Sequence, residues 1–182
     1  IESKLTALLI MNDLQEKIFN VILALVQIDD FPEYYKSHAI RYGFLNYVAK
    51  YSLAKDSYLI TDRALEHLNN KGLLTEKGLR KGLKSKKNGF TYEHPIPSNI
   101  ISTEIVKYRD SKEKIAKILD WTDLITVLTN EEDSLLTSAK LIKDMPKEWK
   151  FLKDSPFARY QKVGLIGAGN LKSIKVFGPL KR

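Results

Sequence analysis

An acid and a histidine stand side by side in the middle of the chain, at Glu93 and His94. They follow an aromatic, β-prone run at residues 90–92, and Pro95 comes directly after them. Because proline lacks an amide proton and keeps the preceding residue extended, the sequence predicts a strand that ends at this pair. A turn at a strand end can bring both side chains to one cleft, where a carboxylate can hold a metal ion and an imidazole can act as a base. The alternative is that His94 caps a turn and Glu93 points into water.

A run of positive side chains precedes this pair, in the sequence KGLRKGLKSKK at residues 77–87. So close to the acid–histidine pair, such a run can hold a phosphate backbone across a cleft. The alternative is a solvated linker between two parts of the chain. The candidate nucleic-acid ligands in this run are Lys77, Arg80, Lys81, Lys84, Lys86 and Lys87.

The whole chain shares this positive character, with a net charge of +8 over 182 residues. An excess of basic residues favours a polyanionic partner, most often nucleic acid, although a lysine-rich composition also serves solubility. No apolar run approaches the roughly 20 residues that a membrane span requires, so we expect no membrane partner. The absence of cysteine excludes disulfides, cysteine-bound zinc and thiol nucleophiles, and it fits a cytoplasmic protein.

Apolar periodicity predicts helices over most of the first half. Hydrophobic residues recur at three- and four-residue steps in residues 1–28, where Asn12 or Asp13 is a candidate cap, and an aromatic helical pattern covers 32–54. Residues 61–68 begin with a capping signal, and Thr75 is expected to cap one more short helix. We therefore expect a helical domain at residues 1–85, with nucleic-acid binding as its candidate role.

The second half has a mixed pattern. A helical pattern covers residues 102–119, with a break near residues 110–111, where Ser111 can cap a second turn. Residues 123–128 are rich in β-branched side chains and predict a strand. A helix should follow, because Thr129 and Glu132 have the spacing of a capping box. Residues 86–182 are thus expected to form a second domain, and the whole chain an α+β fold.

The order of strand, acid–histidine–proline, second strand and helix resembles the HNH nucleases, whose core is known as ββα-metal. The similarity covers roughly residues 90–140. It implies a small nuclease core after the mainly helical amino-terminal part. In that core His94 would activate water as general base, while Glu93 and Asp133 would hold a divalent ion, Mg²⁺ or Mn²⁺.

The resemblance implies metal-dependent hydrolysis of DNA phosphodiester bonds, by an enzyme of the restriction or phage-defence type. Two other functions stay open: a non-catalytic nucleic-acid-binding protein, and a toxin that cleaves RNA. DNA is therefore the first partner expected and RNA the second. A homodimer with another copy of the chain is also considered.

Two stretches near the carboxyl end offer further interpretations. Glu148 and Lys150 have the Glu-x-Lys spacing of another nuclease core, although Pro146 predicts a turn there rather than a strand. The basic and aromatic segment at residues 147–159 can grip nucleic acid by stacking and charge, or it can pack the last helix onto the core.

Overall fold

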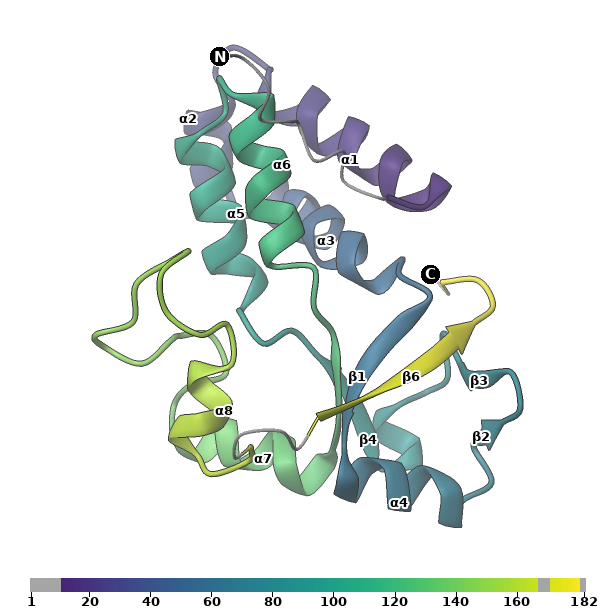
Figure 1. Ribbon diagram of the computed structural model, residues 1–182. Coiled ribbons are helices and arrows are strands. Elements are labelled where there is room, and N and C mark those ends of the chain that lie inside the picture. Colours follow the sequence, from purple (N-terminus) through teal and green to yellow (C-terminus); the bar gives the residue numbers. More distant parts are fainter. Residues whose placement is uncertain (1–10, 167–170, 181–182) are drawn as a thin grey trace, which may run out of the picture.

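The computed structural model describes residues 11–166 and 171–180. Helices gather at one end of the molecule, and a sheet with further helices lies at the other (Figure 1). Within the described residues no helix is long and apolar enough to cross a bilayer. The helices are α1 (Asp13–Val26), α2 (Phe31–Lys36), α3 (His38–Leu53), α4 (Asp62–Asn70), α5 (Ser98–Lys107), α6 (Lys112–Trp121), α7 (Asn130–Ser138) and α8 (Ala158–Lys162), with a 3₁₀ turn, η1, at Lys86–Asn88.

One mixed sheet contains the strands β1 (Ser57–Thr61), β2 (Leu74–Thr75), β3 (Gly78–Arg80), β4 (Phe90–Glu93), β5 (Thr126–Thr129) and β6 (Leu171–Phe177). Their order across the sheet is β2-β3-β6-β1-β5-β4. β1 lies inside the sheet, parallel to β5 and antiparallel to β6. β4 forms one edge and runs antiparallel to β5.

The α+β fold expected from the sequence is confirmed, together with the helical amino-terminal part. The sheet, however, takes β1, β2 and β3 from before residue 85 and β4, β5 and β6 from after it. The expected division into domains 1–85 and 86–182 therefore cuts through one sheet, and the first part is not helical throughout. These early strands have five, two and three residues. Strands so short carry too little periodicity to be told from loops.

A first core lies between α1, α3, α5 and α6, with Ile22, Phe44 and Ile105 fully buried. Side-chain caps set where two of its helices, α1 and α6, begin. The Asn12 side chain accepts a hydrogen bond from the Gln15 amide at the start of α1, as one of the two predicted caps would. Such caps satisfy amide groups that the first helical turn leaves without a partner.

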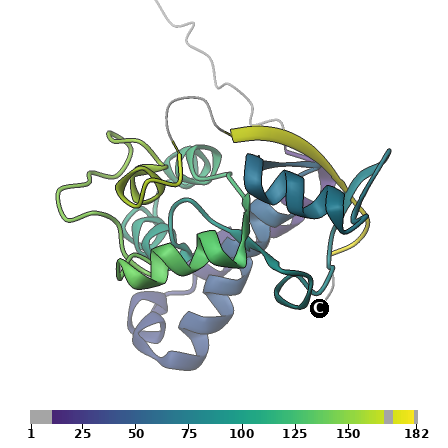
Figure 2. The same ribbon diagram turned by 90° about the horizontal axis from the view of Figure 1, so that it is seen from below.

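Two smaller cores cover the two faces of the sheet. Ile60, Leu79 and Val127 are buried on the face that α4 covers. Leu128 and Tyr160 are buried on the opposite face, under α7 and α8. The latter two helices lie side by side, apart from α4 (Figure 1 and Figure 2). Because neighbouring residues of a strand point to opposite faces, β5 is buried along its whole length.

Residues 74–80 form a hairpin rather than the short helix expected after a cap at Thr75. β2 and β3 pair antiparallel, and the Thr75 hydroxyl donates to the Gly78 carbonyl. Gly78 has a φ of 99°, and a Cβ there would lie 2.1 Å from the carbonyl oxygen of Lys175 in β6. Only glycine permits this close approach, so the sheet requires the residue that a helix would disfavour.

Glu132 joins the starts of two helices. The predicted capping box is confirmed, since the Glu132 amide donates to Thr129 Oγ1 and the Thr129 amide donates to Glu132 Oε2. The same Oε2 atom also accepts a hydrogen bond from Thr61 Oγ1 at 2.8 Å. Thr61 in turn caps α4 through the amide of Ala64. One oxygen of this buried carboxylate therefore holds the starts of α4 and α7 together at the sheet.

Candidate functional site

β4 ends at Glu93, as the proline after His94 predicts. The last pair of the β4–β5 ladder joins Glu93 to Thr126. Phe90 and the alternating position Tyr92 belong to the core on the α4 face, so Glu93 points to the face that carries α7 and α8. The chain thus contains the order β4, β5, α7 that the resemblance implies, with α5 and α6 between the two strands.

Arg159 of α8 is the main partner of Glu93. Its guanidinium is fully buried, and Nη2 donates to Glu93 Oε1 and to the His94 carbonyl. Nε donates to the Pro95 carbonyl at 2.8 Å, and Nη1 donates to the Leu141 carbonyl at 2.6 Å. Arg159 therefore ties the end of β4 to the segment after α7. Removing it would leave a buried carboxylate and several carbonyls without partners, which is costly.

Burial raises the pKa of Glu93, against the charge and hydrogen bond of Arg159, which lower it, while Asp133 raises it further. Asp133 lies on α7 and is partly buried. Burial raises the pKa of Asp133, and the charges of Lys86 and Arg159 lower it. Asp133 thus acts electrostatically on Glu93, and Arg159 acts on both.

Glu93 and Asp133 were predicted to hold a divalent ion. Within residues 11–166 and 171–180 no three His, Asp or Glu side chains form a group that could hold one. The Glu93 carboxylate binds the Arg159 guanidinium, and a guanidinium and a divalent ion compete for the same oxygens. This arrangement fits an internal cation rather than Mg²⁺ or Mn²⁺. Metal binding by Glu93 and Asp133 stays a prediction.

His94 is held in one orientation by a main-chain carbonyl. Its Nε2 lies 3.1 Å from the carbonyl oxygen of Ala49 in α3, so Nε2 carries the proton that is donated. Nδ1 makes no hydrogen bond within the described part of the chain. Solvent can reach it, because Nδ1 is not one of the buried side-chain atoms there that lack a partner. Burial lowers the pKa of His94 to about 4, with the Ala49 bond opposing this shift and the Arg159 charge adding to it. The imidazole is therefore neutral at pH 7, with Nδ1 as its basic nitrogen.

Glu93 and His94 both line a cleft of about 560 Å³. Its walls come from α3, the end of β4, the start of α5 and the segment after α7. Exposed Arg41 and Lys143 give it positive charge, and exposed Tyr42 gives it an aromatic ring. A neutral imidazole beside two cations can take a proton from water while an anionic group is held nearby.

The basic run at residues 77–87 divides into two kinds of side chain. Lys81 is buried, donates to the Ala54 carbonyl at 3.1 Å and pairs with Asp56. This corrects the prediction for Lys81, because it holds β3 to the turn before β1 and cannot reach a phosphate. The other predicted ligands are exposed: Lys77, Arg80, Lys84, Lys86 and Lys87.

The turn η1 fixes part of this run beside α7 and α4. Asn130 Nδ2 donates to the Lys86 carbonyl at 3.1 Å, and His67 Nε2 donates to the Asn88 carbonyl at 2.8 Å. The run therefore flanks the start of β4, whereas the cleft lies at its end. At about 3.3 Å per residue, the two ends of this four-residue strand are roughly 10 Å apart.

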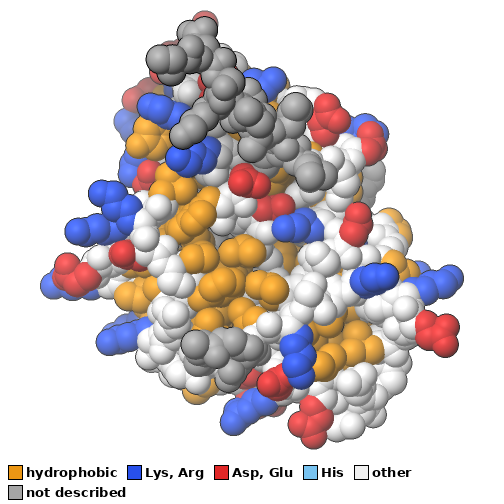
Figure 3. All heavy atoms as spheres, viewed as in Figure 1, with side chains coloured by type: hydrophobic (Ala, Val, Ile, Leu, Met, Phe, Trp, Pro, Cys, Tyr) orange, Lys and Arg blue, Asp and Glu red, His pale blue; other side chains and the backbone are white. Residues whose placement is uncertain are grey.

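The aromatic residues of the segment 147–159 pack internally. Trp149 stacks on Trp121 and meets the edge of Phe151, so these rings face one another. Apolar side chains gather in this region of the surface, between α6 and α8 (Figure 3). Packing rather than nucleic-acid stacking is thus the interpretation that these contacts favour. Arg159 was expected only as the end of this segment, and its pairing with Glu93 was missed.

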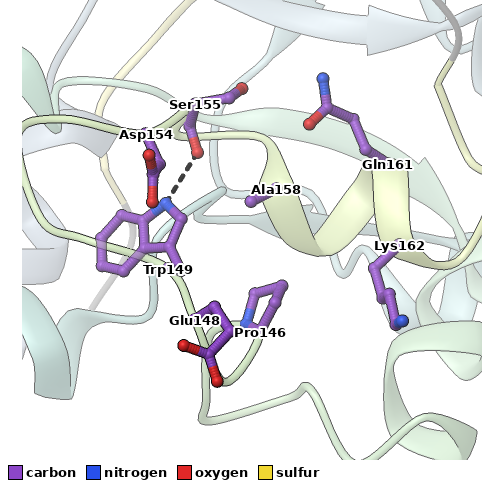
Figure 4. Close-up of a pocket in the computed structure, with 8 residues that line it drawn as sticks. All are labelled: Pro146, Glu148, Trp149, Asp154, Ser155, Ala158, Gln161 and Lys162. Carbon is purple, nitrogen blue, oxygen red and sulfur yellow. Dashed lines mark hydrogen bonds between the residues drawn. The ribbon is translucent and has the colours of Figure 1, made fainter.

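The Glu-x-Lys alternative lies away from the cleft. Glu148 is in the turn predicted from Pro146 and lines a separate hollow, in which Trp149 Nε1 donates to the Ser155 carbonyl (Figure 4). No strand positions Glu148 or Lys150 among the described residues. The hollow therefore does not have the strand-borne acid and lysine that this second nuclease core requires.

No family model matches the chain, and neither a curated protein nor a solved structure matches it. The resemblance to the HNH nucleases therefore gains no support and loses none from these comparisons. The function has to be argued from the cleft and its side chains.

Proposed function

We propose that the chain hydrolyses phosphodiester bonds of nucleic acid in the cleft beside His94, with DNA as the first substrate. The state of His94 supports this proposal. The imidazole is neutral at pH 7 and is oriented by the Ala49 carbonyl, and no group among the described residues forms a hydrogen bond with its basic Nδ1. A well-placed general base is worth about 100- to 10,000-fold in rate, and since a pKa of about 4 makes the His94 imidazole a weak base at pH 7, its contribution belongs at the lower end of this range.

In this mechanism His94 Nδ1 accepts a proton from a water molecule as the water oxygen attacks phosphorus. The bond from phosphorus to the leaving sugar oxygen breaks, and that oxygen takes its proton from solvent water. Arg41 and Lys143 attract the phosphodiester and stabilise the negative charge that builds up on its oxygens. Arg159 has a positioning role, because it holds the His94 carbonyl and Glu93 in place. All the side chains given a role in this mechanism lie within the described residues.

A second candidate is a non-catalytic nucleic-acid-binding protein, and a specific observation favours it. Glu93 and His94 each have a structural partner, in Arg159 and in the Ala49 carbonyl. Both contacts would stabilise the fold even if no reaction took place. The exposed lysines and arginine around η1 would then bind the phosphate backbone without cleavage.

The substitution His94→Gln separates the two candidates. The glutamine amide can still donate to the Ala49 carbonyl, but it has no basic nitrogen. We expect cleavage of a labelled DNA duplex or single strand to fall at least about 100-fold, with binding unchanged. The matched control is His67→Gln, because His67 also donates from Nε2 to a carbonyl but lies at η1.

Parental cleavage rates in His94→Gln would rule out His94 as the base. A parent that binds DNA and RNA but cleaves neither would instead support the second candidate. Cleavage of RNA alone would support the toxin interpretation over the DNA enzyme.

A further inference from the structure

The outer face of α3 carries an aromatic ring into the cleft. Tyr42 is 64% exposed, whereas Phe44 and Tyr51 of the same helix are each 1% exposed and belong to the core. Tyr42 and Asn46 are one helical turn apart, so both line the cleft from one stripe of α3. The ring thus lies in water within the cleft that also contains His94.

Two amide side chains line the same cleft as this ring, those of Asn46 and Asn99. Asn99 Nδ2 donates to the Lys143 carbonyl at 3.1 Å, which fixes the Asn99 side chain and leaves its oxygen free to accept. Asn46 is exposed and makes no side-chain hydrogen bond within the described residues. Amide side chains of this kind recognise the polar edges of bases.

The charges at the cleft are suited to a phosphate. The Arg41 guanidinium lies 5.6 Å from the centre of the Tyr35 ring, which supports it without neutralising it. No ion pair joins Arg41 or Lys143 to a carboxylate within the described ranges. Among the described residues that line the cleft, Glu93 has the one carboxylate, and it is already paired with Arg159.

The size of the cleft limits what can enter. A volume of about 560 Å³ falls in the range of roughly 300–1,000 Å³ that holds one small ligand. A base that is paired in a duplex is already stacked on both sides, so only an unpaired base can stack on a protein ring. An aromatic ring, base-edge donors and acceptors, and free cations together match one unpaired nucleotide.

We infer that the cleft binds a single unpaired nucleotide, with its base stacked on Tyr42 and its phosphate held by Arg41 and Lys143. The substrate is then single-stranded nucleic acid or the single-stranded part of a larger structure. This inference rests on the proposed function for the bond that is cleaved, but the recognition itself requires no cleavage.

The test measures binding in the His94→Gln protein, so that hydrolysis cannot affect the result. The probes are a labelled single strand of DNA, the same strand of RNA, a single strand without bases, and a DNA duplex. Tyr42→Ala is expected to weaken binding to the base-containing strands about 5- to 150-fold, and to leave the other two probes unchanged. Tyr42→Phe, which keeps the ring, should bind like the parent.

The matched control is Tyr47→Ala, because Tyr47 is 39% exposed on the same helix but does not line the cleft. Equal affinity of Tyr42→Ala and its parent for the base-containing strands would overturn the inference. Equal affinity for strands with and without bases, or no binding to any probe, would do the same. If His94→Gln cleaves normally while Tyr42→Ala still loses affinity, the proposed base is wrong and the nucleotide site stands.

Discussion

The two ends of β4 carry charge in different ways. At its end, Arg159 is fully buried and its donors bind Glu93 and main-chain carbonyls. At its start, Lys84, Lys86 and Lys87 are exposed around η1. Arg159 holds the end of β4 in place, and its donors are already engaged in internal hydrogen bonds. The three lysines, in contrast, are available to bind phosphate. Counting basic residues in the sequence treats both groups alike, and only burial and partners separate them.

The largest effect should come from the buried charge. Arg159→Ala leaves Glu93 and the carbonyls of His94, Pro95 and Leu141 without their partner. We expect the free energy of unfolding to fall by about 3–5 kcal/mol, measured by urea denaturation. Arg80→Ala, at an exposed position, should change it by less than about 0.5 kcal/mol. Similar losses in both variants would contradict the distinction between the two ends of β4.

A second effect concerns pH and His94, the half-buried histidine of the cleft. The pKa of His94 falls from 6.5 to about 4 on folding. Between pH 4 and pH 6.5, therefore, His94 is protonated in the unfolded chain and mostly neutral in the folded chain. Stability should therefore rise with pH across this window, by up to about 3 kcal/mol from His94 alone.

His94→Gln should remove this contribution, and His67→Gln should keep it. The free energy of unfolding of all three proteins, measured at pH 4, 5 and 6.5, gives the comparison. The raised pKa of Glu93 acts in the opposite direction in each protein, so it cancels in the differences. Parallel pH curves for the parent and His94→Gln would show that His94 titrates normally.

A third effect should appear at the start of β4. Replacing Arg80, Lys84 and Lys87 by Gln removes exposed charges, so fewer counterions are released when nucleic acid binds. We expect the slope of log affinity against log salt to flatten by about two to three units, equally for two unrelated sequences. Lys81→Gln should leave the slope unchanged and lower stability instead, because Lys81 is buried. A solvated linker would leave the slope of the triple variant unchanged as well.

The smallest expected effect is that of a chelator. If Glu93 stays paired with Arg159 in the working protein, excess EDTA should leave the cleavage rate unchanged. Loss of cleavage in EDTA, with recovery in Mg²⁺ or Mn²⁺, would support the metal ligands expected from the sequence. In that case Arg159 must release Glu93 when the ion binds. Both ends of β4 would then have charged side chains that are available to a ligand.

Local signals in the sequence predicted local structure. Pro95 marked the end of β4, Ser111 caps α6, and the Thr129–Glu132 capping box begins α7. Each of these features depends on contacts within a few residues, so its physical cause is visible in a short stretch of sequence.

The parts that the sequence did not predict depend on distant contacts. Glu93 and Arg159 are 66 residues apart, and nothing in the residues around either one indicates the other. Lys81 looks like its exposed neighbours, but it follows buried Leu79 by two residues and therefore points inward with it. The hairpin at residues 74–80 depends on the approach of β6, which follows nearly a hundred residues later. Charge and propensity describe single residues, and these outcomes are properties of pairs.

The Glu132 carboxylate, which joins the cap of α4 to the capping box of α7, also sets the register of two strands. Glu132 Oε2 receives Thr61 Oγ1 from the end of β1 and the Thr129 amide from the end of β5, at 2.8 and 2.9 Å. A slip of one residue between these parallel strands would move Thr61 by about 3.3 Å and break the first bond. It would also turn the buried side chains of β1 to the wrong face. The hydrogen bond from Thr61 to Glu132 therefore favours the observed alignment of β1 and β5, because a misaligned pairing would leave a buried carboxylate without one of its donors.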